Sequence, residues 1–93
     1  MKALGFVEVP SVTGAVDCLD LMCKAANVEL VTWERKLGGR LVTLVITGEV
    51  DAVNAALDAT VSAVKTPVAK AIIARPHEET IRLVELSASR LKK

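Results

Sequence analysis

Few side chains in this sequence have both the type and the spacing that catalysis needs. The one histidine, His77, stands beside Pro76 and is followed by Glu78 and Glu79, without a nucleophile or a glycine-rich phosphate loop nearby. A single histidine in such a setting is more often structural or exposed than catalytic. We therefore expect no catalytic residues and no cofactor, and we do not predict an enzyme.

Two cysteines, Cys18 and Cys23, are the remaining candidates for metal or redox chemistry. Their positions turn them away from each other on a helix and match no zinc or thioredoxin spacing. Free cysteine usually packs as a small apolar side chain. We predict two buried or half-buried thiols and no metal site.

The composition limits the partners that the chain can have. Its 93 residues suffice for one domain, and 52% are hydrophobic although only 2% are aromatic. This aliphatic content exceeds what a solitary small domain needs, so we expect another subunit to cover part of the surface. A net charge of +1 argues against nucleic acid or an anionic membrane as a partner. Without a secretory pattern or an apolar run of roughly 20 residues, the expected location is the cytosol.

Hydrophobic periodicity and chain-breaking residues predict the order of the elements. Apolar and β-branched runs predict four strands, over residues 3–9, 28–35, 41–47 and 68–74. Helical spacing predicts three helices, over residues 11–27, 50–65 and from about 78 onward. The paired glycines Gly38 and Gly39 favour an antiparallel hairpin between the two middle strands.

Apolar stripes on the first two helices predict the faces that pack on the sheet. The first stripe comprises Val12, Val16, Leu19, Cys23 and Ala26. The second comprises Val50, Val53, Leu57, Val61 and Val64. Two strand-helix-strand halves joined by a hairpin predict an α+β fold. It is a ferredoxin-like βαββαβ arrangement, with an antiparallel sheet, two helices on one face and a short C-terminal helix.

Known binding uses of this architecture require different residues. RNA-binding versions stack bases on aromatic side chains, but Phe6 and Trp33 are the only aromatic residues. Copper carriers need two cysteines in the first loop between strand and helix, whereas both cysteines here fall within the predicted helix. A cytosolic regulatory domain of the ACT type, which binds small molecules at a subunit interface, stays open as an alternative.

Four segments, taken in order, resemble the bacterial microcompartment shell-protein domain. They read ALGFVE (3–8), MCKAANVELV (22–31), LVT to GEVDAV (41–53) and ARPH (74–77). Their order and separations are closely similar to those of the family. The resemblance implies one shell domain over residues 1–93, with a core at 3–77 and a variable C-terminal tail at 78–93.

The resemblance also implies a function. Members of this family form flat cyclic hexamers that tile edge to edge into a shell around metabolic enzymes, with a central pore for small polar metabolites. The implied partners are five further copies of the chain, other hexameric, trimeric and pentameric shell proteins, and encapsulated enzymes. The implied location is the microcompartment shell in the bacterial cytoplasm.

Several residues occupy the positions of the family's hexamer-hexamer edge. Lys24 takes the position of the edge lysine, and Arg75 that of an arginine that reaches across the seam to backbone carbonyls. The residues alone favour Lys24 as a surface partner of Asp20, one helical turn earlier, and the resemblance reverses this preference. Three more residues are assigned to the same edge by the resemblance, namely Asn27, Pro76 and His77.

The hairpin loop takes the position that lines the central pore. It consists of Lys36, Leu37, Gly38, Gly39 and Arg40, one residue more than the commoner family pattern. Six inward-pointing copies of Lys36 or Arg40 would favour anionic metabolites, and six copies of Leu37 would make the opening more apolar. Both cations could instead point to solvent around the rim of the opening.

Overall fold

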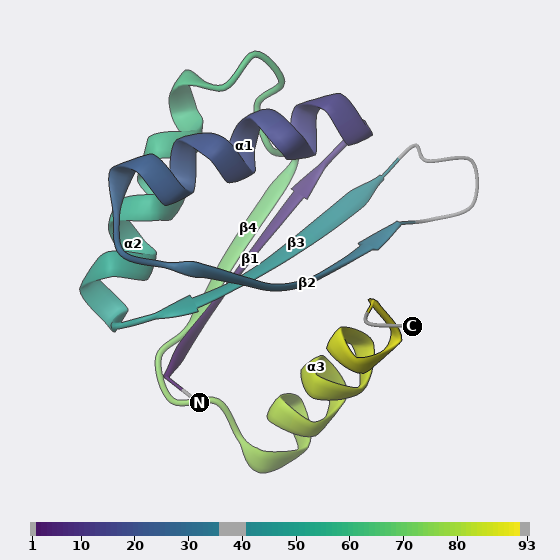
Figure 1. The fold of residues 1–93 in the computed structure, drawn as a ribbon. Coiled ribbons are helices and arrows are strands. Elements are labelled where there is room, and N and C mark those ends of the chain that lie inside the picture. Colours follow the sequence, from purple (N-terminus) through teal and green to yellow (C-terminus); the bar gives the residue numbers. More distant parts are fainter. Residues whose placement is uncertain (1, 36–40, 92–93) are drawn as a thin grey trace.

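A computed structural model describes residues 2–35 and 41–91. The elements are β1 (Ala3–Val9), α1 (Val12–Ala25), β2 (Glu29–Arg35), β3 (Val42–Gly48), α2 (Val50–Ala59), the 3-10 helix η2 (Thr60–Ser62), β4 (Ala69–Ile73) and α3 (Glu78–Leu91). Figure 1 shows α1 and α2 together on one face of the sheet and α3 on the other. The predicted α+β fold is confirmed.

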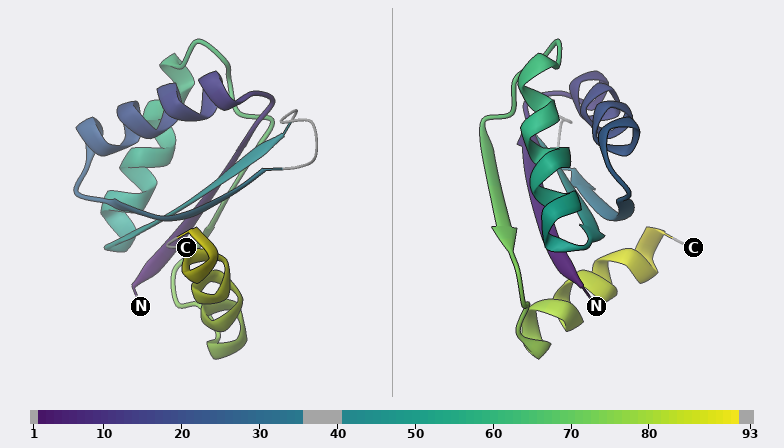
Figure 2. Two further views of the ribbon diagram at one scale, coloured as in Figure 1. Left: turned by 45° about the vertical axis from the view of Figure 1, so that its right-hand side comes forward. Right: turned by 90° about the vertical axis from the view of Figure 1, so that its left-hand side faces the viewer.

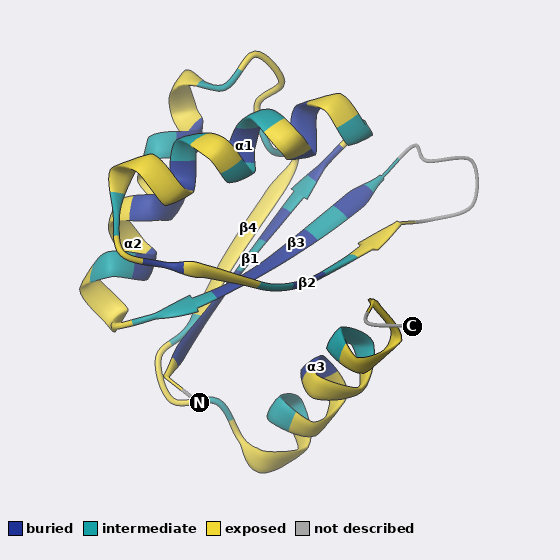
Figure 3. Ribbon diagram, in the orientation of Figure 1, coloured by how far each residue is buried: buried dark blue, intermediate teal, exposed yellow. Residues whose placement is uncertain are grey.

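The sheet is antiparallel, with the strand order β2-β3-β1-β4. β1 pairs with β3 from Ala3 opposite Gly48 to Val9 opposite Val42. β2 and β3 are neighbours as predicted for the middle strands, and Arg35 lies opposite Val42. The two central strands are therefore the first and third in the chain, and β4 forms an exposed edge (Figure 3).

Alternate residues of each strand point to opposite faces, so the sheet supports two cores. The larger core lies beneath α1 and α2 and includes Val7, Val9, Met22, Leu44, Ile46, Val53 and Leu57. The smaller core lies beneath α3, where Val84 packs with Leu4 and Val45 against Phe6 and Val31. Figure 2 shows the layers edge-on.

The buried face of α1 is rotated from the predicted stripe. Ala15, Cys18 and Met22 are fully buried, whereas Val16 and Cys23 are exposed. Val12, Leu19 and Ala26 of the predicted stripe are partly buried and pack against the same core. The prediction of a buried or half-buried thiol is therefore confirmed for Cys18 and wrong for Cys23.

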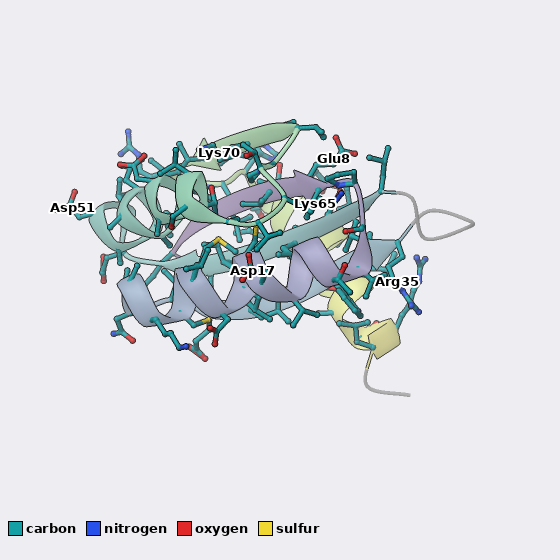
Figure 4. The ribbon with its side chains drawn as sticks, turned by 90° about the horizontal axis from the view of Figure 1, so that it is seen from above. Glu8, Asp17, Arg35, Asp51, Lys65 and Lys70 are labelled. Atoms are coloured by element: carbon teal, nitrogen blue, oxygen red, sulfur yellow. The ribbon has the colours of Figure 1, made fainter. Side chains whose placement is uncertain are left out.

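The segment after η2 is fastened to α1, and for this reason α2 ends earlier than predicted. The backbone N–H of Val64 donates to Asp17 Oδ2 at 2.9 Å, and a Cβ at Gly14 would lie 2.9 Å from Lys65 Cβ. Asp17 and Lys65 are labelled in Figure 4. The chain leaves the helical path to reach these contacts, so Val61 and Val64 are 76% and 87% exposed instead of continuing the apolar stripe.

β1 approaches α2 closely at Gly5. A Cβ at this position would lie 2.7 Å from Val53 Cγ1 and 3.0 Å from Ile46 Cγ1. Val53 and Ile46 are both fully buried. Ordinary contacts between carbon atoms are about 3.5–4.0 Å, so glycine is required here for space.

Candidate functional site

The pairing register defines two ends of the sheet. At one end of the sheet β1 and β2 begin and β3 and β4 end, and we call this the rim end. At the opposite end β1 and β2 end and β3 and β4 begin, and we call this the loop end. The seven residues of β1 separate the two ends by about 20 Å. Helix α1 runs from the loop end to the rim end, and α2 runs back (Figure 1).

Three of the predicted edge residues, Lys24, Asn27 and Arg75, lie at the rim end, the first two beside β2 and Arg75 beyond β4 at the opposite edge of the sheet. Lys24 lies in the last turn of α1. The backbone oxygen of Asn27 lies 2.9 Å from the position of a Cβ on Gly48, the last residue of β3. Arg75 follows Ile73, the last residue of β4. All three residues are exposed, and their assignment to the hexamer edge stays a prediction.

Lys24 is paired within its own helix. Its Nζ lies 2.7 Å from Oδ2 of Asp20, and both side chains are exposed. The hydrogen bond from Lys24 to Asp20, assisted by the charge of Asp20, raises the pKa of Lys24, so the ammonium group is protonated at neutral pH. The surface pair that the sequence allowed is therefore present. It directs the ammonium group back along the helix and leaves the aliphatic part of Lys24 at the surface.

Pro76 and His77 connect the rim end to α3. The Nδ1 atom of His77 accepts a hydrogen bond from the backbone N–H of Glu79 at 3.0 Å. The carbonyl oxygen of His77 accepts another from the backbone N–H of Ile81, also at 3.0 Å. His77 thus caps the first turn of α3. Its assignment to the hexamer edge stays a prediction, as does that of Pro76.

Charged residues that the sequence analysis did not single out surround Asn27. A depression of about 220 Å³ at the rim end is lined by Lys2, Asn27, Glu29, Thr47, Gly48 and Glu49. Lys2 Nζ lies 3.1 Å from Glu49 Oε1. The available signal was that Lys2, Glu29 and Glu49 each adjoin a predicted strand end. The rim end therefore carries charges of both signs.

The predicted pore-lining residues Lys36, Leu37, Gly38, Gly39 and Arg40 lie outside the described residues. Their described neighbour Arg35 stands at the loop end, with its guanidinium carbon 5.3 Å from the centre of the Trp33 ring. Figure 4 shows Arg35 at the end of the molecule opposite Asp51, which lies in the first turn of α2. Arg35 is thus a cation of the loop end that the sequence analysis did not name.

Burial raises the pKa of the Cys18 thiol, and the nearby negative charge of Asp17 adds to the effect. Cys18 is therefore protonated and packed at neutral pH. Within residues 2–35 and 41–91, no three His, Cys, Asp or Glu side chains lie close enough to hold a metal ion. Among the helices of these same residues, none has the length and apolar character needed to cross a membrane.

Comparison with known proteins identifies relatives over almost the whole chain. The model of the BMC domain family matches residues 3–76. The chain is 41% identical over 86 residues to the bacterial microcompartment shell protein PduA of Citrobacter freundii, covering 89% of this chain and 91% of that protein. It is 42% identical over 91 residues to the carboxysome shell protein CsoS1C of Hydrogenovibrio crunogenus, covering 94% and 88% of the two chains.

A solved structure has the same fold. The crystal structure of a microcompartments protein from Desulfitobacterium hafniense DCB matches with a TM-score of 0.77 at 25% identity, covering 94% of this chain and 48% of that one. The resemblance to the shell-protein domain is confirmed. These relatives do not favour the alternative of an ACT-type regulatory domain.

Proposed function

This chain belongs to the BMC domain family, and we propose that it is a structural, non-enzymatic subunit of a bacterial microcompartment shell. The relatives that carry the name of shell protein match it over 89% and 94% of its length. The proposed location is the shell of a microcompartment in the bacterial cytoplasm. The proposed shell domain spans residues 1–93, with α3 in its variable part.

Six copies form a cyclic hexamer in this proposal, with every loop end toward the axis and every rim end outward. The observation that supports it is that Arg35 and Val42, which flank residues 36–40 in the sequence, pair at the end of the sheet opposite the end that carries Lys24 and Arg75. The exposed side chains Val61, Val64, Val68 and Ile72, beside or within β4, provide apolar surface for the contact between neighbours in the ring. Such head-to-tail contacts close into a ring when the rotation between subunits permits.

The rim end forms the seam between adjacent hexamers. Two Lys24 side chains meet antiparallel across the seam, where their aliphatic parts pack and each ammonium group keeps its own Asp20. Pairing with Asp20 offsets the repulsion between the two like charges. Arg75 reaches carbonyl oxygens of the neighbouring hexamer through its five N–H donors. Asn27, Pro76 and His77 complete the seam.

The loop end forms a central pore from six copies of residues 36–40. Glycine amides of this segment would donate hydrogen bonds to polar metabolites. Cations from Lys36 or Arg40 would favour anionic metabolites, and Leu37 would narrow the opening with an apolar ring. The other hexameric, trimeric and pentameric shell proteins are the further partners, together with the enclosed enzymes.

The proposal is tested by native mass and by imaging. The chain should sediment as a hexamer or a multiple of six in dilute solution and should form sheets or tubes when concentrated. The Lys24→Ala substitution should abolish these layers and leave the ring intact, because it removes a contact between hexamers and none within a hexamer. Lys65→Ala is the matched control, since it removes the same charge from the loop end of the molecule.

Three outcomes contradict the proposal. A stable monomer or a dimer that never forms layers excludes the shell function. Layers that survive Lys24→Ala as well as they survive Lys65→Ala exclude the assigned seam. A ring that falls apart in Lys24→Ala places this residue between subunits of one ring instead.

A further inference from the structure

We propose that α3 carries a self-complementary surface that pairs with α3 of a second copy, antiparallel and about a twofold axis. The surface is a stripe of four residues, Glu79, Leu83, Leu86 and Arg90, spaced by four, three and four positions. This spacing places all four on one face of the helix. Leu83 and Leu86 are 68% and 50% exposed, and the two charged residues are exposed as well.

The other faces of α3 are accounted for. Val84, only 5% exposed, is buried against the sheet. Ser87 Oγ donates to Glu34 Oε2, so its oxygen is free to accept from Thr32 Oγ1 at 2.8 Å. The remaining exposed residues are Glu78, Arg82, Glu85 and Ser89, which make a polar face, and Leu91 in the last turn. The apolar contact of Val84 and the hydrogen bonds of Ser87 together fix the orientation of α3 on the sheet. Leu83 and Leu86 therefore point in a fixed direction.

The stripe is its own complement when two copies run antiparallel. Glu79 lies as far before the midpoint of the stripe as Arg90 lies after it, and the same is true of Leu83 and Leu86. A twofold axis at this midpoint sets Leu83 against Leu86 of the second copy and Glu79 against its Arg90. Each carboxylate accepts more than one donor, so Glu79 can keep its contact of 3.1 Å with Arg82.

The sheet has room for the second helix. α3 lies closest to β2, at one edge of the sheet. Four strands about 4.8 Å apart make a face about 15 Å across, and packed helices lie about 8–10 Å from each other. This face therefore accommodates two helices side by side and carries one (Figure 2).

A groove marks the vacant half of this face. It has a volume of about 340 Å³ and runs between α3 and the sheet, where Leu83, Leu86 and Arg90 face Phe6, Thr43 and Val45. A second depression of about 230 Å³ continues it over β1 and β4, beside Phe6 and Glu8. The leucines of the second copy fill this apolar groove. The two chains then pack through the faces that bear α3.

If the proposed function holds, the same pairing of α3 helices would join two hexameric rings. Six α3 pairs would join two hexamers through the face that bears α3, and six weak contacts acting together hold far more tightly than one. The pairing itself does not depend on the ring, since it involves two chains only. The predicted particle has twelve chains with the ring and two chains without it.

Charge exchange tests the pairing by sedimentation of the full chain at dilute concentration. Glu79→Arg and Arg90→Glu each set like charges against each other and should halve the particle mass. The double variant Glu79→Arg/Arg90→Glu restores opposite charges and should restore the mass. Glu78→Arg is the control, because it makes the same charge change beside Arg82 but on the polar face.

Cysteine crosslinking tests the same contact without altering its charges. Leu83→Cys and Leu86→Cys chains, each carrying Cys23→Ser to remove the exposed native thiol, are purified separately and mixed. The mixture should give several-fold more disulfide-linked dimer than either chain alone. The placement of Leu83 opposite Leu86 across the axis predicts this difference.

Three results overturn the pairing. The first is a particle mass that neither single variant lowers, and the second is a double variant that stays at half mass without crosslinks in the mixture. A change in ring size would instead place α3 between neighbours of one ring, which also overturns it. A wild-type dimer that the single variants convert to monomers would support the pairing and refute the hexamer. The two proposals therefore fail separately.

Discussion

Gly5→Ala should destabilise the chain although it adds an apolar group in the middle of a strand. The new methyl carbon would lie 2.7 Å from Val53 Cγ1 and 3.0 Å from Ile46 Cγ1. The shorter distance is about 1 Å below an ordinary contact between carbon atoms. Both neighbours are fully buried, so relief requires a shift of α2 away from the sheet.

The size of the effect follows from two opposing terms. Adding a methyl group to a well-packed core costs about 1–3 kcal/mol. Replacing glycine lowers the conformational entropy of the unfolded chain and returns about 0.4–1 kcal/mol. The expected net loss is about 1–2 kcal/mol, or a decrease in Tm of roughly 5–15 °C for a domain of this size.

A double-mutant cycle with Val53→Ala isolates the clash. Val53→Ala alone leaves a cavity and destabilises, but in the double variant the methyl group introduced by Gly5→Ala occupies part of the vacated space. The loss in the double variant should therefore be smaller than the sum of the two single losses by about 0.5–3 kcal/mol. Urea unfolding at one protein concentration measures this, because association also contributes to stability. A Gly5→Ala chain as stable as the wild type, or two losses that simply add, would refute the argument.

Three further predictions concern the helices and the thiols. Ser11→Ala removes the hydroxyl that accepts from the backbone N–H of Gly14 at 3.0 Å and should cost about 1 kcal/mol in urea unfolding. Val84→Ala removes the buried contact of α3, about 1.6 kcal/mol for two carbon atoms, and should speed amide hydrogen exchange in α3 by roughly tenfold. Iodoacetamide should label exposed Cys23 first and Cys18 only at a higher pH than a free cysteine needs, because burial raises the pKa of Cys18.

Each of these predictions has a matched control. Thr66→Ala removes a hydroxyl from an exposed position outside the helices and should have little effect on unfolding. Glu85→Ala shortens an exposed side chain of α3 and should leave hydrogen exchange unchanged. Cys23→Ser leaves Cys18 as the one thiol for alkylation. Exchange in α3 that is equally fast in both variants, or rapid labelling of Cys18 at neutral pH, would contradict the contacts described above.

The strands and their order could be predicted from the sequence because both depend on local signals. β-branched runs and Pro10 mark the strands, and the paired glycines mark the hairpin. Two strand-helix-strand halves joined by a hairpin can form only a few sheet topologies. The face of α1 was predicted in part, since Val12, Leu19 and Ala26 pack against the core whereas Val16 and Cys23 are exposed. The end of α2 was predicted wrongly because it depends on distant contacts. Asp17 draws the chain near Val64 toward α1, and no local pattern around residue 64 records that contact.

The sequence proposes the candidate edge residues but not their arrangement. Lys24 and Arg75 were named from their sequence context, but their common position at the rim end follows from the strand register. The sequence analysis did not single out the stripe on α3. Its exposure depends on Val84 and Ser87, which fix the side of the helix that meets the sheet.

The opposed ends of the sheet have a consequence for how such a protein diversifies. The pair Arg35 and Val42 anchors the hairpin in the ladder, so changes within residues 36–40 leave the strand register and the rim end as they are. Under the proposed assembly, duplicated genes that differ only in this segment would yield subunits that share one ring. A cell would then adjust the permeability of its shell in graded steps, through the ratio in which it expresses the duplicated genes. The contacts between hexamers would stay the same.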